Sequence, residues 1–109
     1  MTVEQLIKAA DLNPIALPNP ERELSGAYIG DLLSWVMGRA RENDAWVTIM
    51  SNSNIIAVAT LADVSCIILA EGVTPDDGVA DTAKARGVNL LSSEKSAYEI
   101  AKLLSNIGL

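Results

Sequence analysis

The sequence predicts an α/β protein, a single three-layer domain that contains a mostly parallel sheet with helices on both faces. Residues 46–50 and 66–70 are nearly continuous apolar runs, a pattern typical of parallel strands that are covered on both sides. Segments with helical periodicity alternate with these runs, and this alternation is typical of layered α/β domains. The length of 109 residues suits one domain over 1–109 with a substantial core.

The first part of the chain predicts a helix, a short strand and an extended segment. Thr2 and Gln5 have the spacing of a capping box, and apolar residues three and four apart follow them. We expect this helix to end at Asn13, because a residue that precedes proline avoids helical geometry. A short strand over 15–17 and an extended segment over 24–29 then follow.

The next segment, residues 29–40, predicts an amphipathic helix. Its apolar residues recur at spacings of three and four and form one face, with Asp31 as the expected N-cap. Trp35 lies off this apolar face. Residues 54–62 are almost entirely apolar and rich in β-branched residues, so their propensity also allows a hairpin strand. We predict a helix there, because the two flanking strands need a crossover if they are parallel.

The last third predicts a helix, a strand and a final helix. Thr74 is the expected cap of the first helix, Pro75 its first residue, and Gly87 its end. Residues 88–91 form a weaker third strand. The final helix is expected to begin at about Ser93.

The charge and the residue types exclude several functions. The formal net charge is −6 and the 8 basic residues are scattered, so we expect no nucleic-acid binding. The chain has no histidine and one cysteine, Cys66, which excludes Ser-His-Asp and Cys-His catalysis, histidine-based zinc sites and an internal disulfide. We expect no catalysis, no cofactor and no metal. Cys66 is either a small core residue or a reactive thiol.

The sequence also lacks the features of a membrane protein. No run approaches the roughly 18 apolar residues of a bilayer span, and the N-terminus lacks the pattern of a signal peptide. We therefore expect a cytoplasmic protein that does not associate with membranes.

The segment from Glu21 to Ala27 is the strongest functional signal. It joins an arginine and a hydroxyl residue to a turn of small residues. It resembles the signature of the DRTGG domain family: Glu21 stands for Asp, Arg22 for Arg, Ser25 for Thr, and Gly26-Ala27 for the two glycines. Three of these five positions are substituted, with the chemical character largely kept.

The resemblance extends over nearly the whole chain and includes residues 30–34, Thr48, and residues 54–59, 67–69 and 97–100. It implies a fold like that of the N-terminal domain of HPr kinase/phosphorylase. In the family this module appears beside CBS domains in some inorganic pyrophosphatases and in some phosphotransacetylases. Some stand-alone members are encoded near iron-hydrogenase genes of anaerobic bacteria. The resemblance implies a regulatory or assembly module, commonly dimeric, with a hydrogenase or a phosphotransfer enzyme as a possible partner.

Stand-alone members of the family are often described as serine kinases, but the residues do not support kinase chemistry here. The chain contains no G-x-x-x-x-G-K-[ST] phosphate loop and no protein-kinase motif set. A nucleotide- or phosphate-metabolite-sensing domain is the alternative to an assembly module.

The candidate ligand-binding residues are Arg22, Ser25, Gly26, Asp31, Thr48, Ser51 and Asn54. Arg22 beside a small-residue turn can hold a phosphate or carboxylate bidentately, or it can pair with a local acid or backbone carbonyls. Ser51 and Asn54 follow a predicted strand, where ligands gather in open α/β sheets. The same residue types are ordinary helix caps, so both interpretations stay open.

A partner surface is the remaining candidate. The predicted helix over 54–62 has no clear polar face and must be buried, either within the monomer or against a second subunit. Tyr28 and Trp35 are candidate contact anchors, because aromatic residues are enriched at interfaces. We expect a homodimer.

Overall fold

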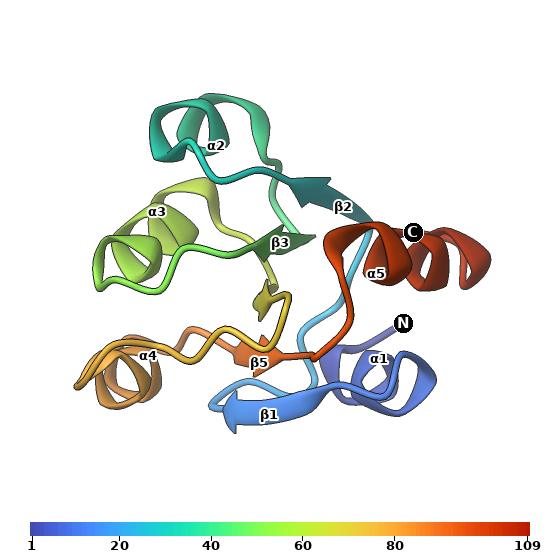
Figure 1. Ribbon diagram of the computed structural model, residues 1–109, viewed down its shortest axis with the longest axis horizontal. Helices are drawn as coiled ribbons and strands as arrows, with labels where there is room; N and C mark the ends of the chain where they lie inside the picture. The colour runs from blue at the N-terminus through green and yellow to red at the C-terminus, as the bar shows by residue number, and fades with distance from the viewer.

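The computed structural model describes residues 1–109 and confirms the α/β fold with a mostly parallel sheet (Figure 1). Five strands form one sheet in the order β1-β5-β4-β3-β2. The four parallel strands are β2 (Gly26–Ile29), β3 (Asp44–Thr48), β4 (Cys66–Leu69) and β5 (Leu90–Ser92), and β1 (Asn13–Ala16) pairs antiparallel with β5.

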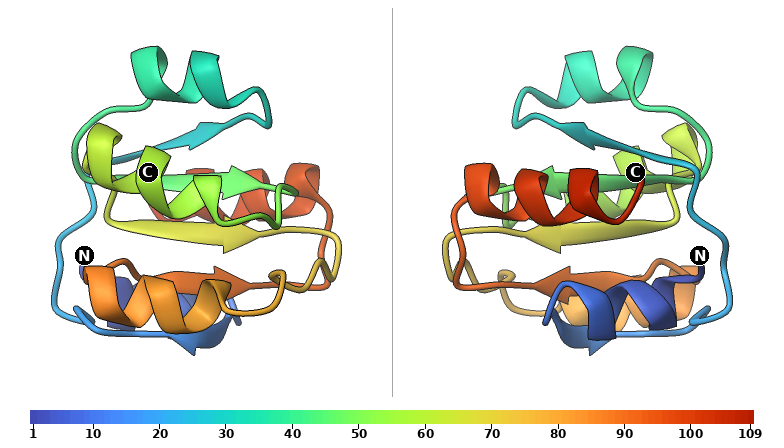
Figure 2. Two further views of the ribbon diagram at one scale, coloured as in Figure 1. Left: turned by 90° about the vertical axis from the view of Figure 1, so that its left-hand side faces the viewer. Right: turned by 90° about the vertical axis from the view of Figure 1, so that its right-hand side faces the viewer.

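Helices cover both faces of the sheet (Figure 2). One face carries α2 (Leu33–Arg39), α3 (Asn54–Ala62) and α4 (Val79–Arg86), and the other carries α1 (Val3–Ala9) and α5 (Ala97–Asn106). Each of α2, α3 and α4 connects two neighbouring parallel strands in the same direction along the sheet. Because such crossovers share one hand, all three helices lie on one side. A buried apolar cluster fills the space under each helical layer.

The strand β2 forms one edge of the sheet, and one of its faces is uncovered. Register pairs Ala27 with Ala45 and Ile29 with Val47, so these four side chains point to the same face. Ala45 and Val47 are buried beneath the α1 and α5 layer, which does not reach over β2 (Figure 2). Ile29 is consequently 46% exposed.

Several sequence-based expectations for the elements are confirmed. Thr2 and Gln5 form the expected capping box at the start of α1. Residues 54–62 form a helix, so the hairpin-strand alternative was wrong. Gly87 ends α4 in the left-handed conformation, with φ of 72°.

The start of the second helix was predicted wrongly. Ile29 is the last residue of β2 because its strand pairing with Val47 overrides its helical spacing. The helix begins at Leu33 with Leu32 as N-cap, and no side chain caps it. Asp31, the expected cap, is turned instead toward the end of β3.

The starts of the last two helices also lie later than expected. Thr74 and Pro75 are in a loop, and α4 begins after Gly78. Gly78 has a φ of 85°, in the left-handed region, so a helix that began at Pro75 could not continue through it. The final helix begins after Ser96 rather than Ser93, because Ser96 and Glu99 form a second capping box.

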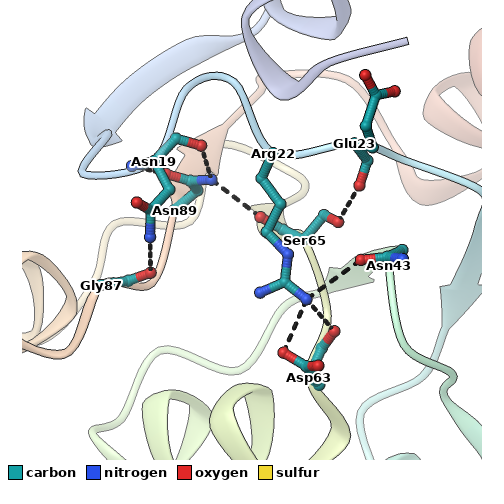
Figure 3. A network of polar contacts seen from close by, with 8 residues as sticks. All are labelled: Asn19, Arg22, Glu23, Asn43, Asp63, Ser65, Gly87 and Asn89. Carbon is teal, nitrogen blue, oxygen red and sulfur yellow. Dashed lines mark hydrogen bonds and ion pairs between the residues drawn. The ribbon is translucent and has the colours of Figure 1, made fainter.

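The loop of residues 17–25 connects β1, at one end of the sheet, to β2, at the other. It crosses the amino ends of the strands between them (Figure 3). The longest helix, α5, has 10 residues, and none of the helices could cross a bilayer.

Candidate functional site

Arg22 lies in the 17–25 loop, at the amino ends of β3 and β4. Its Nη2 atom donates to the carbonyl oxygen of Asp63 at 2.6 Å, to Asp63 Oδ1 at 2.7 Å and to Asn43 Oδ1 at 3.3 Å (Figure 3). Asn43 and Asp63 both have positive φ, of 69° and 58°, which turns the chain into the strands that follow. These contacts are those of an arginine that pairs with a local acid and a backbone carbonyl.

The rest of the loop is held by a second group of polar contacts. Asn19 N donates to Asn89 Oδ1 at 2.9 Å, and Asn89 Nδ2 donates to the carbonyls of Asn19 and Ser65 at 2.8 and 3.0 Å. Ser65 Oγ donates to the carbonyl of Glu23. Asn89 is 1% exposed, so its amide is fully used in fixing the loop to the sheet (Figure 3).

A different set of candidate residues lies at the carboxyl ends of β2 and β3. Asp31 Oδ1 accepts from Thr48 Oγ1 at 2.9 Å and from Ile49 N at 3.0 Å. Ser51 Oγ donates to Asp76 Oδ1 at 2.9 Å, and Asp76 N donates back to the carbonyl of Ser51. These side chains tie loops to one another across the edge of the sheet.

The seven sequence-predicted residues therefore fall into two groups at opposite ends of the parallel strands. Arg22, Ser25 and Gly26 lie at the amino ends, whereas Asp31, Thr48, Ser51 and Asn54 lie at or beyond the carboxyl ends. The four parallel strands are neighbours in chain order, so their order does not reverse. Because such a reversal is what opens a ligand crevice in open α/β sheets, the second group has no crevice of this kind.

A surface cleft of about 470 Å³ lies along the amino half of the edge strand β2. Its lining is made by the edge strand together with the segment that runs from α2 to β3: Ser25, Gly26, Ala27, Tyr28, Arg39, Arg41, Glu42 and Asp44. The last three signature positions, at 25–27, thus belong to this cleft. Arg22 does not line it.

Asp44 is the buried polar group of this cleft. It is 7% exposed, and its Oδ2 atom accepts from the backbone N–H of Arg41 at 2.8 Å. Its Oδ1 atom accepts no hydrogen bond within the chain. Since no side-chain polar atom is both buried and without a partner, Oδ1 must be reached by solvent.

Two arginines stand beside Asp44 without an acidic partner. The ion pairs of the chain are Met1 with Glu23, Arg22 with Asp63, and Lys95 with Asp11. Arg39 and Arg41 are in none of these ion pairs, so both can bind an anionic group of a ligand. The Arg39 guanidinium lies 3.7 Å from the centroid of the Trp35 ring, a cation–π contact that holds it against this side chain.

Sequence reasoning missed Arg39, Arg41 and Asp44 as members of a site. The two arginines lie two positions apart, a spacing that Lys84 and Arg86 share, so no distinctive signal in the sequence marked them. Asp44 begins a strand, and only the pairing of Gly26 with Asp44 places it beside the signature.

Cys66 is buried at the start of β4. Burial in apolar surroundings raises the pKa of its thiol from 9.0 to about 12, although the nearby Arg22 charge lowers it slightly. The side chain packs in the core under α1 and α5, as a small core residue does.

Exposed apolar side chains occur at the β2 end of the sheet, on both of its faces. They come from β2, from α2 and its preceding loop, and from the residue after β3: Ile29 at 46%, Leu32 at 57%, Trp35 at 52%, Met37 at 47% and Ile49 at 47% exposed. Tyr28, the other expected contact anchor, instead packs against the core under α2, α3 and α4. The apolar face of α3 is buried within the monomer through Ile55, Ile56, Val58 and Ala59.

Comparison with known proteins adds a family and a fold. The DRTGG domain family matches residues 22–107. The structure is similar to the CBS and DRTGG domains of the regulatory region of Clostridium perfringens pyrophosphatase, complexed with the activator diadenosine tetraphosphate. The TM-score is 0.75 at 12% identity, over 94% of this chain and 45% of that chain, so this chain spans less than half of that structure. Among curated proteins, no sequence matches.

Proposed function

Since this chain belongs to the DRTGG domain family, we propose that it is a non-catalytic regulatory or assembly module, a homodimer that binds a partner enzyme or a small ligand. The family match over 22–107 carries this proposal. Two observations support a non-catalytic role. The chain contains no histidine, and the pKa of its single thiol is raised to about 12. A hydrogenase or a phosphotransfer enzyme is the kind of partner that we propose.

We propose further that residues 1–109 act as one cytoplasmic DRTGG-type unit. The matched range begins at residue 22, after α1 and β1. These two elements nevertheless complete the sheet, because β1 pairs with β5 and α1 packs in the same cluster as α5. This supports their being part of the module.

The exposed apolar side chains around β2 and α2 support the homodimer. Large exposed apolar groups gathered in one region of a small protein mark interaction sites more often than scattered ones do. Trp35 is the expected anchor, since tryptophan is enriched among residues that dominate binding energy.

Light scattering over 1–100 μM tests the homodimer. We expect a dimer for the wild type and a shift toward monomer for Trp35→Ser. Leu61→Ser is the matched control, because Leu61 is 73% exposed on α3 and lies outside this group. A wild-type protein that is monomeric at every concentration would rule out the homodimer.

Nucleotide or phosphate-metabolite sensing is the second candidate function. The related pyrophosphatase region is complexed with an activator that is a dinucleotide, and the two unpaired arginines of the cleft favour an anionic ligand here. Thermal-shift screening against nucleotides, acyl phosphates and sugar phosphates tests it. A melting temperature that no compound raises at millimolar concentration would count against sensing and would leave the dimer untouched.

A further inference from the structure

We propose that the cleft along β2 is a binding site for a nucleoside phosphate, with the phosphate on Arg39 and Arg41 and a hydroxyl or amino group of the ligand donating to Asp44. This rests on the second candidate function, and it assigns that function to residues outside the Arg22 part of the signature.

The two arginines give the site its affinity for phosphate. A guanidinium binds phosphate through two parallel hydrogen bonds, which makes arginine the residue of choice for this group. Arg39 and Arg41 have no acidic partner in a chain that contains 14 acidic residues. Both line one cleft, and the proposed position of the phosphate lies between them.

Asp44 decides what else the ligand must carry. Its carboxylate is 7% exposed and one of its oxygens has no donor within the chain. Oδ1 is the oxygen that faces solvent, so a ligand that fills the cleft and supplies a hydrogen-bond donor can replace water there. Inorganic phosphate brings its negative charge close to Asp44 and to Glu42, which also lines the cleft, and is repelled by both.

The edge of β2 supplies a third kind of contact. β2 pairs with β3 on one side only, so its outer edge presents backbone N–H and C=O groups without partners. A nucleobase edge carries donors and acceptors side by side and matches such a row. Ser25 lines the same cleft, and its Oγ makes no hydrogen bond within the chain, so it is available to the ligand. The volume of about 470 Å³ lies in the range of small-molecule sites.

Isothermal titration calorimetry with AMP tests the site, with inorganic phosphate and adenosine as the two halves of the ligand. We expect saturable AMP binding at least tenfold tighter than that of either half. Arg39→Gln and Arg41→Gln should each weaken AMP binding at least tenfold. Arg86→Gln, an exposed arginine on α4 without an ion pair, should leave it unchanged.

The Asp44→Asn variant distinguishes a nucleoside phosphate site from a site that binds any anion. We expect it to weaken AMP binding while it strengthens the binding of inorganic phosphate, because a repulsive charge is removed and an acceptor is lost. Circular dichroism checks the fold of each variant.

Three results would overturn the proposal: no saturable binding of AMP, ADP or ATP up to 5 mM, equal affinity for AMP and inorganic phosphate, or AMP binding that survives both arginine substitutions. A dimer seen by light scattering alongside any of these results would leave the assembly role standing.

Discussion

At the scale of single residues, Gly26 illustrates how the lack of a side chain serves both the sheet and the cleft. A Cβ atom at position 26 would lie 2.8 Å from Asp44 Oδ1, a separation that forces one of the groups to move. Glycine at position 26 therefore leaves the room that the Asp44 carboxylate occupies beside β2.

Gly26→Ala should destabilise the protein by about 1 kcal/mol, because the added methyl group displaces the Asp44 carboxylate and disturbs its hydrogen bond with the Arg41 N–H. Gly38→Ala is the matched control. Nothing lies within 4 Å of a Cβ there, and alanine favours the helix by about 0.5–1 kcal/mol. Urea unfolding of both variants measures the two effects, and equal stabilities would contradict this account.

Arg22 is expected to act through stability. Its ion pair with Asp63 is partly exposed, with side-chain exposures of 27% and 58%, so the charge contributes only part of the effect. The hydrogen bonds that Arg22 donates to the Asp63 carbonyl and to Asn43 also contribute to stability. Arg22→Ala should lower the free energy of unfolding by about 1–2 kcal/mol. Glu21→Ala, exposed and without a partner, should change it by less than about 0.5 kcal/mol.

Cys66 should make the stability depend on pH in the alkaline range. The folded-state pKa of about 12 lies above the unfolded value of 9.0, so the unfolded chain loses its thiol proton first. Stability from this group is fully present below pH 9.0 and is lost as the pH rises toward 12, by up to about 1.4 kcal/mol per pH unit. The difference between wild type and Cys66→Ala, measured by denaturant unfolding from pH 8 to 10.5, isolates this contribution. A parallel pH dependence in the two proteins would contradict it.

At the scale of elements, local signals predicted the existence of the helices and strands better than their limits. α1 was predictable because a capping box acts within a few residues, whereas α3 was predicted from the crossover that two parallel strands require. The starts of α2 and α4 were missed because they depend on distant partners. Ile29 is held by β3, and Asp76 is held by Ser51 from the preceding crossover.

The capping box of α5 gives a measurable test of such local signals. Ser96 Oγ accepts from Glu99 N at 3.2 Å, so Ser96→Ala should cost about 1 kcal/mol of stability. Ser105→Ala lies on an exposed position of the same helix and should be neutral or slightly stabilising. Thermal unfolding of the two variants compares them, and an unchanged melting temperature for Ser96→Ala would show that the cap contributes little.

The candidate site was only half predictable for a similar reason. The signature drew attention to residues 21–27, and its small residues do line a cleft. The charged residues of that cleft come from 39–44, and no pattern within the sequence links the two segments. Their meeting depends on the parallel register of β2 and β3, which only the folded chain reveals.

At the scale of the whole molecule, charge opposes the association that the apolar side chains favour. Two subunits of net charge −6 repel one another across any shared surface. Raising the NaCl concentration from 10 to 150 mM shortens the screening length from about 30 Å to about 8 Å and weakens this repulsion. The proposed dimer should therefore tighten by a factor of about two to ten, which sedimentation equilibrium can measure. Dissociation on adding salt would indicate an interface held by ion pairs.

Because the 17–25 loop places β1 and β2 at opposite edges of the sheet, it affects the order in which the strands can pair during synthesis. β2, β3, β4 and β5 are neighbours in the order in which they leave the ribosome, so that part of the sheet can grow one strand at a time. β1 is synthesised first, yet its partner β5 lies more than 70 residues later. The pairing of β1 can therefore form only after β5 has emerged. β1 is made well before the strand with which it pairs, and the contacts of Asn19 and Arg22 fasten the loop that follows it.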